Sequence, residues 1–300
     1  MNRLLVLAVV VFSITACGKE EPIIDTTPDF TNLLNNLGND VILATYQDLS
    51  IKGASLQTAA ANLEADPSPE NLEAARRAWV AARSPWEQSE GFLFGPVDQE
   101  GLDPSLDSWP VNVTDLNNVL NSNNELTVSF LEQQEGTLKG FHTIEFLLWG
   151  EDGNKTVDQL SAREFEYLAA CAGALANDTE ALYNLWAPAS GNYIENIVKA
   201  GNGSPVYISQ KSAVEEITNA LVIIADEVAN GKINEPLSQM DLSLEESRFS
   251  SNSKADFADN MRSIQNIYVG NFGVRGNGIG LSIVVANENP TLDSKVKNQI

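Results

Sequence analysis

The residues best suited to chemistry lie in one short segment around His142, the only histidine in the chain. Glu145 follows three positions later, and residues three apart on a helix share a face, so the two side chains would point the same way. Gly140 lacks a side chain near that face and allows another part of the chain to approach closely. Two interpretations stay open: His142 and Glu145 are ligands of one metal ion, or they form a buried hydrogen-bonded pair.

A second segment, residues 83–97, places Glu87 and Glu90 on one helical face among aromatic residues that include Trp86. Carboxylates in an apolar setting need a cation, an arginine or a shared proton. Arg83 lies one turn before Glu87 and is the simplest such partner. The segment therefore predicts either a metal-ligating face or a buried ion pair.

A third segment, residues 245–262, again mixes polar and aromatic side chains. Asp256 and Asn260 are four positions apart, which places them on one face of a helix. They are candidates for the same site, and the alternative is a capped helix whose polar face is solvated.

The segment Gly140-x-His142-x-x-Glu145 resembles the G-x-H-x-x-E signature of the imelysin family. The similarity extends over nearly the whole chain after its first residues. It is carried by Trp86-Glu-Gln-Ser-Glu-Gly-Phe92, Trp109-Pro110, Ser247-Arg-Phe-Ser250, Asp256-Phe257 and Tyr268-Val-Gly270. Family members typically continue with further helices after the point where this chain stops, which leaves a C-terminal truncation open.

The resemblance implies an all-α fold of two helical bundle-like domains with a site at their interface. It also implies export, a link to bacterial iron uptake, and membership of a group once classed as metallopeptidases. Carried over to this chain, the implied site consists of His142, Glu145, Glu90, Glu87, Arg83 and Trp86 from the first bundle and Ser250, Asp256 and Asn260 from the second.

The residue types favour binding over proteolysis. A chain with one histidine cannot form the H-E-x-x-H site of the common zinc peptidases, and it contains no G-x-S-x-G nucleophile motif. The ferritin-like di-iron pattern needs two E-x-x-H motifs, whereas this chain has a single pair in reversed order. Oxygen ligands with one imidazole suit iron better than zinc or calcium. We expect a binding protein for iron or an iron-bearing ligand; a metal-dependent peptidase using His142 and Glu145, and a scaffold with a purely structural His142, are the alternatives.

Hydrophobic periodicity near 3.6 residues predicts helices through most of the chain. A capping box at Ser161 marks the start of a long helix, Pro85 suggests a kink, and Gly231 suggests a helix end. The predicted helices cover residues 30–63, 69–95, 116 onward (capped by Thr114 or Asp115), 137–149, 162–186, 193–200, 210–230, 253–269 and 292 onward, with loops at 97–110 and 270–280. The best division is a bundle of residues 30–157 and a second bundle of residues 158–300.

The N-terminal residues predict where the protein is located. Residues 1–16 have the charge and apolar run of a signal peptide, and Ile14-Thr-Ala-Cys17 resembles a bacterial lipobox, so Cys17 is the expected lipidation site. Residues 17–29 are expected to form a tether, and the run Lys19-Glu20-Glu21 resembles a surface-export tag. We expect a cell-envelope lipoprotein of the outer membrane, on its periplasmic face or the cell surface, with an iron transporter or outer-membrane receptor as partner.

The net charge of −23 argues against nucleic acid as a partner and would attract cations. Cys171, the only cysteine besides Cys17, lies in an alanine-rich helical stretch and is expected to be a small buried residue.

Overall fold

A computed structural model describes residues 28–300. Within that range the chain is helical with no β-strand, only one isolated bridge, which confirms the all-α prediction. The signal peptide, Cys17 and most of the tether lie outside the described residues. No helix of the described part is both long and apolar enough to cross a membrane.

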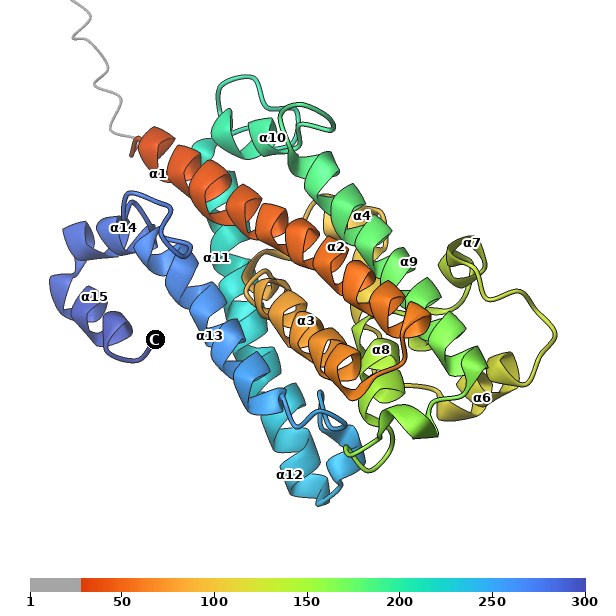
Figure 1. The fold of residues 1–300 in the computed structure, drawn as a ribbon. Helices are drawn as coiled ribbons and strands as arrows, with labels where there is room; N and C mark the ends of the chain where they lie inside the picture. Colours follow the sequence, from red (N-terminus) through yellow and green to blue (C-terminus); the bar gives the residue numbers. More distant parts are fainter. Residues whose placement is uncertain (1–27) are drawn as a thin grey trace, which may run out of the picture.

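The first half is organised around one long helical rod (Figure 1). The rod runs through α1 (Thr31–Asn36), the π-helical segment η1 (Leu37–Ile42) and α2 (Leu43–Ala65), and α3 (Pro69–Glu87) and α9 (Ala162–Trp186) pack along α2. α8 (Gly140–Trp149) packs against both α3 and α9. Leucines on the inner face of the rod, such as Leu49 and Leu56, are fully buried, as the 3.6-residue period predicts. The division at residues 157 and 158 stays a prediction.

α3 passes through Pro85 without ending, and the kink expected there stays a prediction. The prediction for the next segment was wrong. The expected loop 97–110 contains two short helices, α4 (Pro96–Gln99) and α5 (Leu102–Asp107), held down by the buried side chains of Leu102 and Leu106.

The rest of the connection to α8 is a series of short elements. It consists of η2 (Glu90–Phe92) before α4, then α6 (Val113–Leu120), α7 (Val128–Glu132) and η3 (Gly136–Leu138). α6 begins three residues earlier than expected, because Asn112 and not Thr114 or Asp115 is its cap: the Asn112 side chain accepts a hydrogen bond from the backbone N–H of Asp115.

The second half begins with η4 (Val157–Gln159) and α9, whose Ser161 capping box is confirmed: the Ser161 N–H donates to the Glu164 carboxylate. α10 (Ile194–Val198) follows, and Cys171 on α9 is buried as expected. A long segment then runs through α11 (Gln210–Asp226), the π-helical η5 (Glu227–Asn234) and α12 (Glu235–Gln239). The prediction that Gly231 ends this helix was wrong, because the glycine sits inside η5, where the helix widens and does not stop.

The last elements are η6 (Leu242–Leu244), α13 (Ser253–Val269), α14 (Leu281–Glu288) and α15 (Pro290–Lys297). α13 has the predicted bounds and ends at Gly270, which is in the left-handed conformation. α13 packs against α11 of the same half and against α3 and η2 of the first half, so it forms part of the contact between the two halves (Figure 1).

Gly140 fixes the contact that matters most for the site. Its φ is +74°, and a Cβ there would lie 2.4 Å from the carbonyl oxygen of Leu106. Only glycine allows the start of α8 to approach the end of α5 so closely. The close approach predicted from the sequence is therefore present, and it brings His142 beside Asp107.

Candidate metal centre

The sequence-predicted site residues meet where five parts of the chain converge on a buried polar cluster. The end of α3 and η2 supply Arg83, Trp86, Glu87 and Glu90; α8 supplies His142 and Glu145; and α13 with the loop before it supplies Ser250, Asp256 and Asn260. Their predicted roles as metal ligands remain predictions. Three further residues complete the cluster: Asp107 at the end of α5, Lys232 in η5, and Glu246 after η6.

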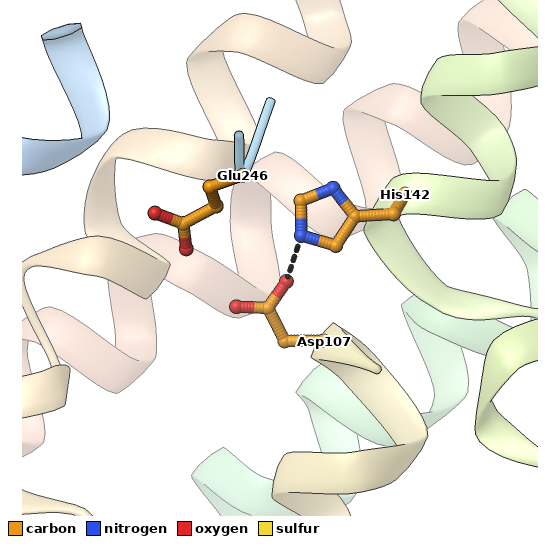
Figure 2. Close-up of side chains that lie close together, drawn as sticks. All are labelled: Asp107, His142 and Glu246. Atoms are coloured by element: carbon orange, nitrogen blue, oxygen red, sulfur yellow. Dashed lines mark ion pairs between the residues drawn. The ribbon is translucent and has the colours of Figure 1, made fainter. Parts of the chain in front are cut away.

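His142 lies between two carboxylates. Its Nε2 is 3.0 Å from Oδ1 of Asp107, and its Nδ1 is 3.1 Å from Oε2 of Glu145. Figure 2 shows the Asp107 contact, with the Glu246 carboxylate close to both side chains. Burial alone would lower the pKa of His142, but Asp107 and Glu145 outweigh it and raise that pKa to about 9. The ring is therefore an imidazolium at neutral pH and donates to both carboxylates.

Glu145 is engaged on both oxygens. Oε2 faces His142, while Oε1 accepts hydrogen bonds from the backbone N–H of Ser250 at 2.8 Å and from its hydroxyl at 2.7 Å. His142 and Glu145 thus form the hydrogen-bonded pair that was one of the two interpretations of their spacing. Glu145 ties α8 to the loop before α13 and orients the imidazole.

Arg83 is the central cation of the cluster and is completely buried. Its Nη1 pairs with Asp107, and its Nη2 lies 2.5 Å from Oε1 of Glu87 and 2.9 Å from Oε1 of Glu246. The ion pair predicted between Arg83 and Glu87 is present. The guanidinium also lies 5.3 Å from the centre of the Phe141 ring, a cation–π distance.

Asp107 accepts from three donors, since Trp86 Nε1 donates to its second oxygen at 2.5 Å in addition to Arg83 and His142. Burial would raise the pKa of Asp107, but Arg83 and His142 hold it well below its usual range. Asp107 is thus ionised at neutral pH, and it is the fixed negative charge of the cluster.

Lys232 provides a second buried cation, with only 3% of its surface exposed. Its Nζ lies 2.7 Å from Oε2 of Glu90, 2.9 Å from Oε1 of Glu246 and 3.4 Å from Oε2 of Glu87. Asn260 donates to the same Glu87 and Glu90 oxygens, at 2.6 and 2.9 Å. This network links α3, η2, η5 and α13.

Negative charge is in excess in the cluster even with His142 protonated. The buried carboxyl groups outnumber Arg83, Lys232 and His142; they are Glu87, Glu90, Asp107, Glu145, Glu246 and Asp256. Burial, reinforced by Glu87, raises the pKa of Glu90 well above its usual range and that of Glu246 to about 7. Burial likewise raises the pKa of Asp256 to about 6.

Two overlapping groups have ligand atoms within 4.8 Å of one another: Asp107, His142 and Glu246, and Glu87, Glu90, Asp107 and Glu246. Within the described part of the chain, Oε2 of Glu246 is buried and has no hydrogen-bond partner. Buried carboxylate oxygens are normally paired, so this oxygen is a free acceptor inside the cluster.

Sequence reasoning missed Asp107, Lys232 and Glu246 for identifiable reasons. Asp107 was inside a segment taken as a loop, and Lys232 lay just beyond the expected end of a helix. Glu246 lay in the third segment but was not assigned a role. For two of these residues the sequence held a signal, because each lies next to a segment that carries the imelysin resemblance. Asp107 comes just before Trp109-Pro110, and Glu246 comes just before Ser247-Arg-Phe-Ser250.

These features define a class: an all-α protein in which one imidazole and several carboxylates form a buried cluster between helices. The imelysin family model matches residues 42–300, and the chain belongs to the imelysin family.

Relatives agree with this assignment. The chain is 32% identical over 258 residues to "Iron-regulated protein A" of Synechococcus elongatus, across 85% of this chain and 67% of that protein. The structure is similar to that of a putative iron-regulated protein A precursor from Parabacteroides distasonis, with a TM-score of 0.81, 28% identity, and 90% of this chain and 83% of that chain covered. An imelysin-like protein from Psychrobacter arcticum shares the fold, with a TM-score of 0.71 and 16% identity over 89% of this chain and 81% of that one.

Proposed function

We propose that this protein binds a metal ion, iron first, at the buried cluster, as a lipid-anchored component of iron uptake at the bacterial cell envelope. The observation that carries the proposal is the excess of buried carboxylates around Asp107, His142 and Glu246, with one Glu246 oxygen left without a partner. Uncompensated buried negative charge is costly, and a cation removes that cost.

The donor set fits such an ion. Carboxylate oxygens with one imidazole suit iron, and the donor set contains no thiolate of the kind typical of structural zinc sites. Ligand atoms about 2.1 Å from one ion can be no more than ~4.2 Å apart, so the groups within 4.8 Å would need to contract by only a few tenths of an ångström. Arg83 and Trp86 would hold Asp107 in place, and Glu145 would orient the His142 ring.

Binding at this cluster would release protons. His142, with a pKa raised to about 9 by its carboxylate neighbours against the effect of burial, must lose a proton before either ring nitrogen can act as a ligand. Glu246, with a pKa raised by burial to about 7, is partly protonated near neutrality. Metal affinity should therefore rise with pH through the neutral range.

The iron-related role is supported by the family and by two relatives whose names describe them as iron-regulated. The lipobox at Cys17 and the tether of residues 17–29 support an envelope location on the outer membrane. A protein anchored there would pass its ion to an iron transporter or outer-membrane receptor. The geometry favours binding over a peptidase centred on His142 and Glu145, because Ser250 and His142 already engage both oxygens of Glu145.

Calorimetric titration and thermal unfolding with Fe²⁺ under argon, and with Zn²⁺ and Ca²⁺, would test the proposal on the purified chain without residues 1–16. A metal at 100 times its Kd stabilises the folded state by about 2.7 kcal/mol, so we expect a clear rise in Tm with Fe²⁺. Glu246→Gln should weaken binding, while the exposed Glu180→Gln on α9 is the matched control and should not. No Tm rise and no heat of binding for any ion would overturn the proposal.

A further inference from the structure

Lys232 stands in the middle of one of the two candidate ligand groups. Its ammonium contacts Glu87, Glu90 and Glu246, and these three are members of the group that could hold a metal ion. A lysine ammonium is a compact point charge, like a metal ion, and not a planar fork that imposes its own geometry. The position that a cation would take among these carboxylates is thus held by a side chain of the protein itself.

The helix around Lys232 is unusual. Lys232 belongs to η5, a π-helical segment of residues Glu227–Asn234 between α11 and α12. π-helical turns are rare, less regular than α-helix and frequent at functional sites. In this segment Lys232 contacts Glu87 at the end of α3 and Glu90 in η2.

A surface pocket adjoins the Lys232 side chain. Lys232 lines a surface pocket of about 560 Å³ with Ile233, Pro236, Leu237 and Phe257. Its apolar walls suit the aliphatic stem of a lysine. The pocket lining also holds one carboxylate, Glu245, as a partner for the ammonium, and one other cation, Lys254. Because Lys232 contacts the cluster and also lines the pocket, the pocket adjoins the cluster.

Arg83 has no comparable freedom. It is completely buried, pairs with Asp107, Glu87 and Glu246, and packs over Phe141. Of the two permanent cations in the cluster, Lys232 is the one that can leave.

We propose that Lys232 is an internal substitute cation: it neutralises Glu87, Glu90 and Glu246 while the cluster holds no metal, and it moves into the adjoining pocket when a metal ion binds. This inference rests on the proposed function and concerns how the same site is controlled. In the ligand group of Glu87, Glu90, Asp107 and Glu246, which does not include His142, replacing one ammonium with a divalent ion adds one positive charge among the carboxylates. The lysine keeps the empty cluster folded and sets a threshold below which metal is not retained.

Amine labelling of the wild-type chain tests the movement directly. The protein is treated with an N-hydroxysuccinimide acetyl ester, without metal and then with saturating Fe²⁺ under argon, and acetylation is followed at each lysine by peptide mass spectrometry. Ligands usually protect side chains, but here Lys232 should become more reactive when Fe²⁺ binds. Lys211, whose side chain is 77% exposed, is the internal control and should not change.

The Lys232→Met variant tests the competition. Apparent affinity is reduced by the fraction of protein in the competent state, so if Lys232 is out less than a tenth of the time, its removal should lower the Kd for Fe²⁺ at least ~10-fold. Lys211→Met should leave the Kd unchanged. Circular dichroism shows whether each variant folds. If Lys232→Met does not fold, the labelling of the wild-type chain still tests the proposal.

The outcomes separate the two proposals. Binding of Fe²⁺ with Lys232 still unreactive would overturn the substitute-cation inference and leave the metal site standing, as would a Kd changed less than ~3-fold in folded Lys232→Met. Binding by Lys232→Met but not by wild type would also overturn the inference, because no metal ion would then displace the lysine of the natural chain. Binding by neither would overturn both.

Discussion

His142 should titrate far above the normal range for a histidine and should thereby control the pH dependence of stability in the metal-free protein. Asp107 and Glu145, each about 3 Å from a ring nitrogen, overcome the effect of burial and raise the pKa of His142 from 6.5 to about 9. At 1.36 kcal/mol per pKa unit, this shift corresponds to about 3 kcal/mol. Because the folded-state pKa is raised, that contribution is fully present below pH 6.5 and is lost as the pH rises through 9.

Other groups in the cluster titrate in a lower window. Burial, with the neighbouring Glu87, raises the pKa of Glu246 from 4.5 to about 7, and burial raises that of Asp256 from 3.8 to about 6. Their contributions have the same sign but are lost before or near pH 7. Above pH 7.5, where Glu246 and Asp256 are already largely ionised, about 2 kcal/mol of the His142 contribution remains to be lost.

Two measurements check this expectation on protein kept in chelator. Urea unfolding between about pH 6 and 10 should show a stability advantage of wild type over His142→Gln that shrinks as the pH rises. Since His142 is the only histidine, its imidazole C–H resonance can be assigned without further mutants and followed directly by NMR. A midpoint below pH 7, or a wild-type advantage that does not change with pH, would refute the assignment of His142 as a carboxylate-held imidazolium.

Two further variants test the cluster, and a third tests the packing of α2 against α9. Arg83→Met should lower the free energy of unfolding by about 3–5 kcal/mol in urea, because it leaves buried carboxylates without their cation; a loss under ~1 kcal/mol would show that the network is solvated. Ser250→Ala should cost about 1.5–3 kcal/mol by removing a hydroxyl donor to the charged Glu145, and an unchanged urea midpoint would contradict this. Gly53→Ala should cost about 1–3 kcal/mol, since its Cβ would lie 2.4 Å from Oγ1 of Thr179 on α9; the double variant with Thr179→Ala should be more stable than the sum of the two single effects, and strict additivity would argue against the clash.

The parts of the fold that could be predicted from the sequence are those in which local signals and packing agree. α9 begins at its Ser161 capping box, and α13 ends at the glycine that its apolar period leads up to. The residues 97–110 were misjudged because Asp, Gly and Pro are turn formers, yet the apolar pair Leu102 and Leu106 still buries one face of a short helix. In that case tertiary burial outweighed local propensity.

The site shows the same division. Spacing of three or four residues correctly placed Glu87 beside Arg83 and His142 beside Glu145, because both pairs lie within one helix. It could not supply Asp107 or Lys232, whose partners are tens of residues away or more and whose approach depends on a glycine contact and on a π-helical turn. The sequence marked Gly140 as a point of close approach but not which segment approaches it, and a π-helical turn has no reliable signature in a single sequence.

The cluster looked simpler in the sequence than it is, because residue spacing reveals only the contacts within one helix. His142 and Glu145 alone suggested a pair of ligands, but long-range contacts place a second carboxylate on the imidazole and a lysine among the remaining acids. The added carboxylate makes His142 a bound imidazolium, and the lysine fills a position suited to a cation. In the proposed function, a metal ion held by Asp107, His142 and Glu246 would displace a proton from His142, and one held by Glu87, Glu90, Asp107 and Glu246 would displace the Lys232 ammonium. The proton exchange would lower the metal affinity as the medium becomes more acidic, and the ammonium exchange would lower it at every pH in the neutral range, so both would favour release to the transporter proposed above.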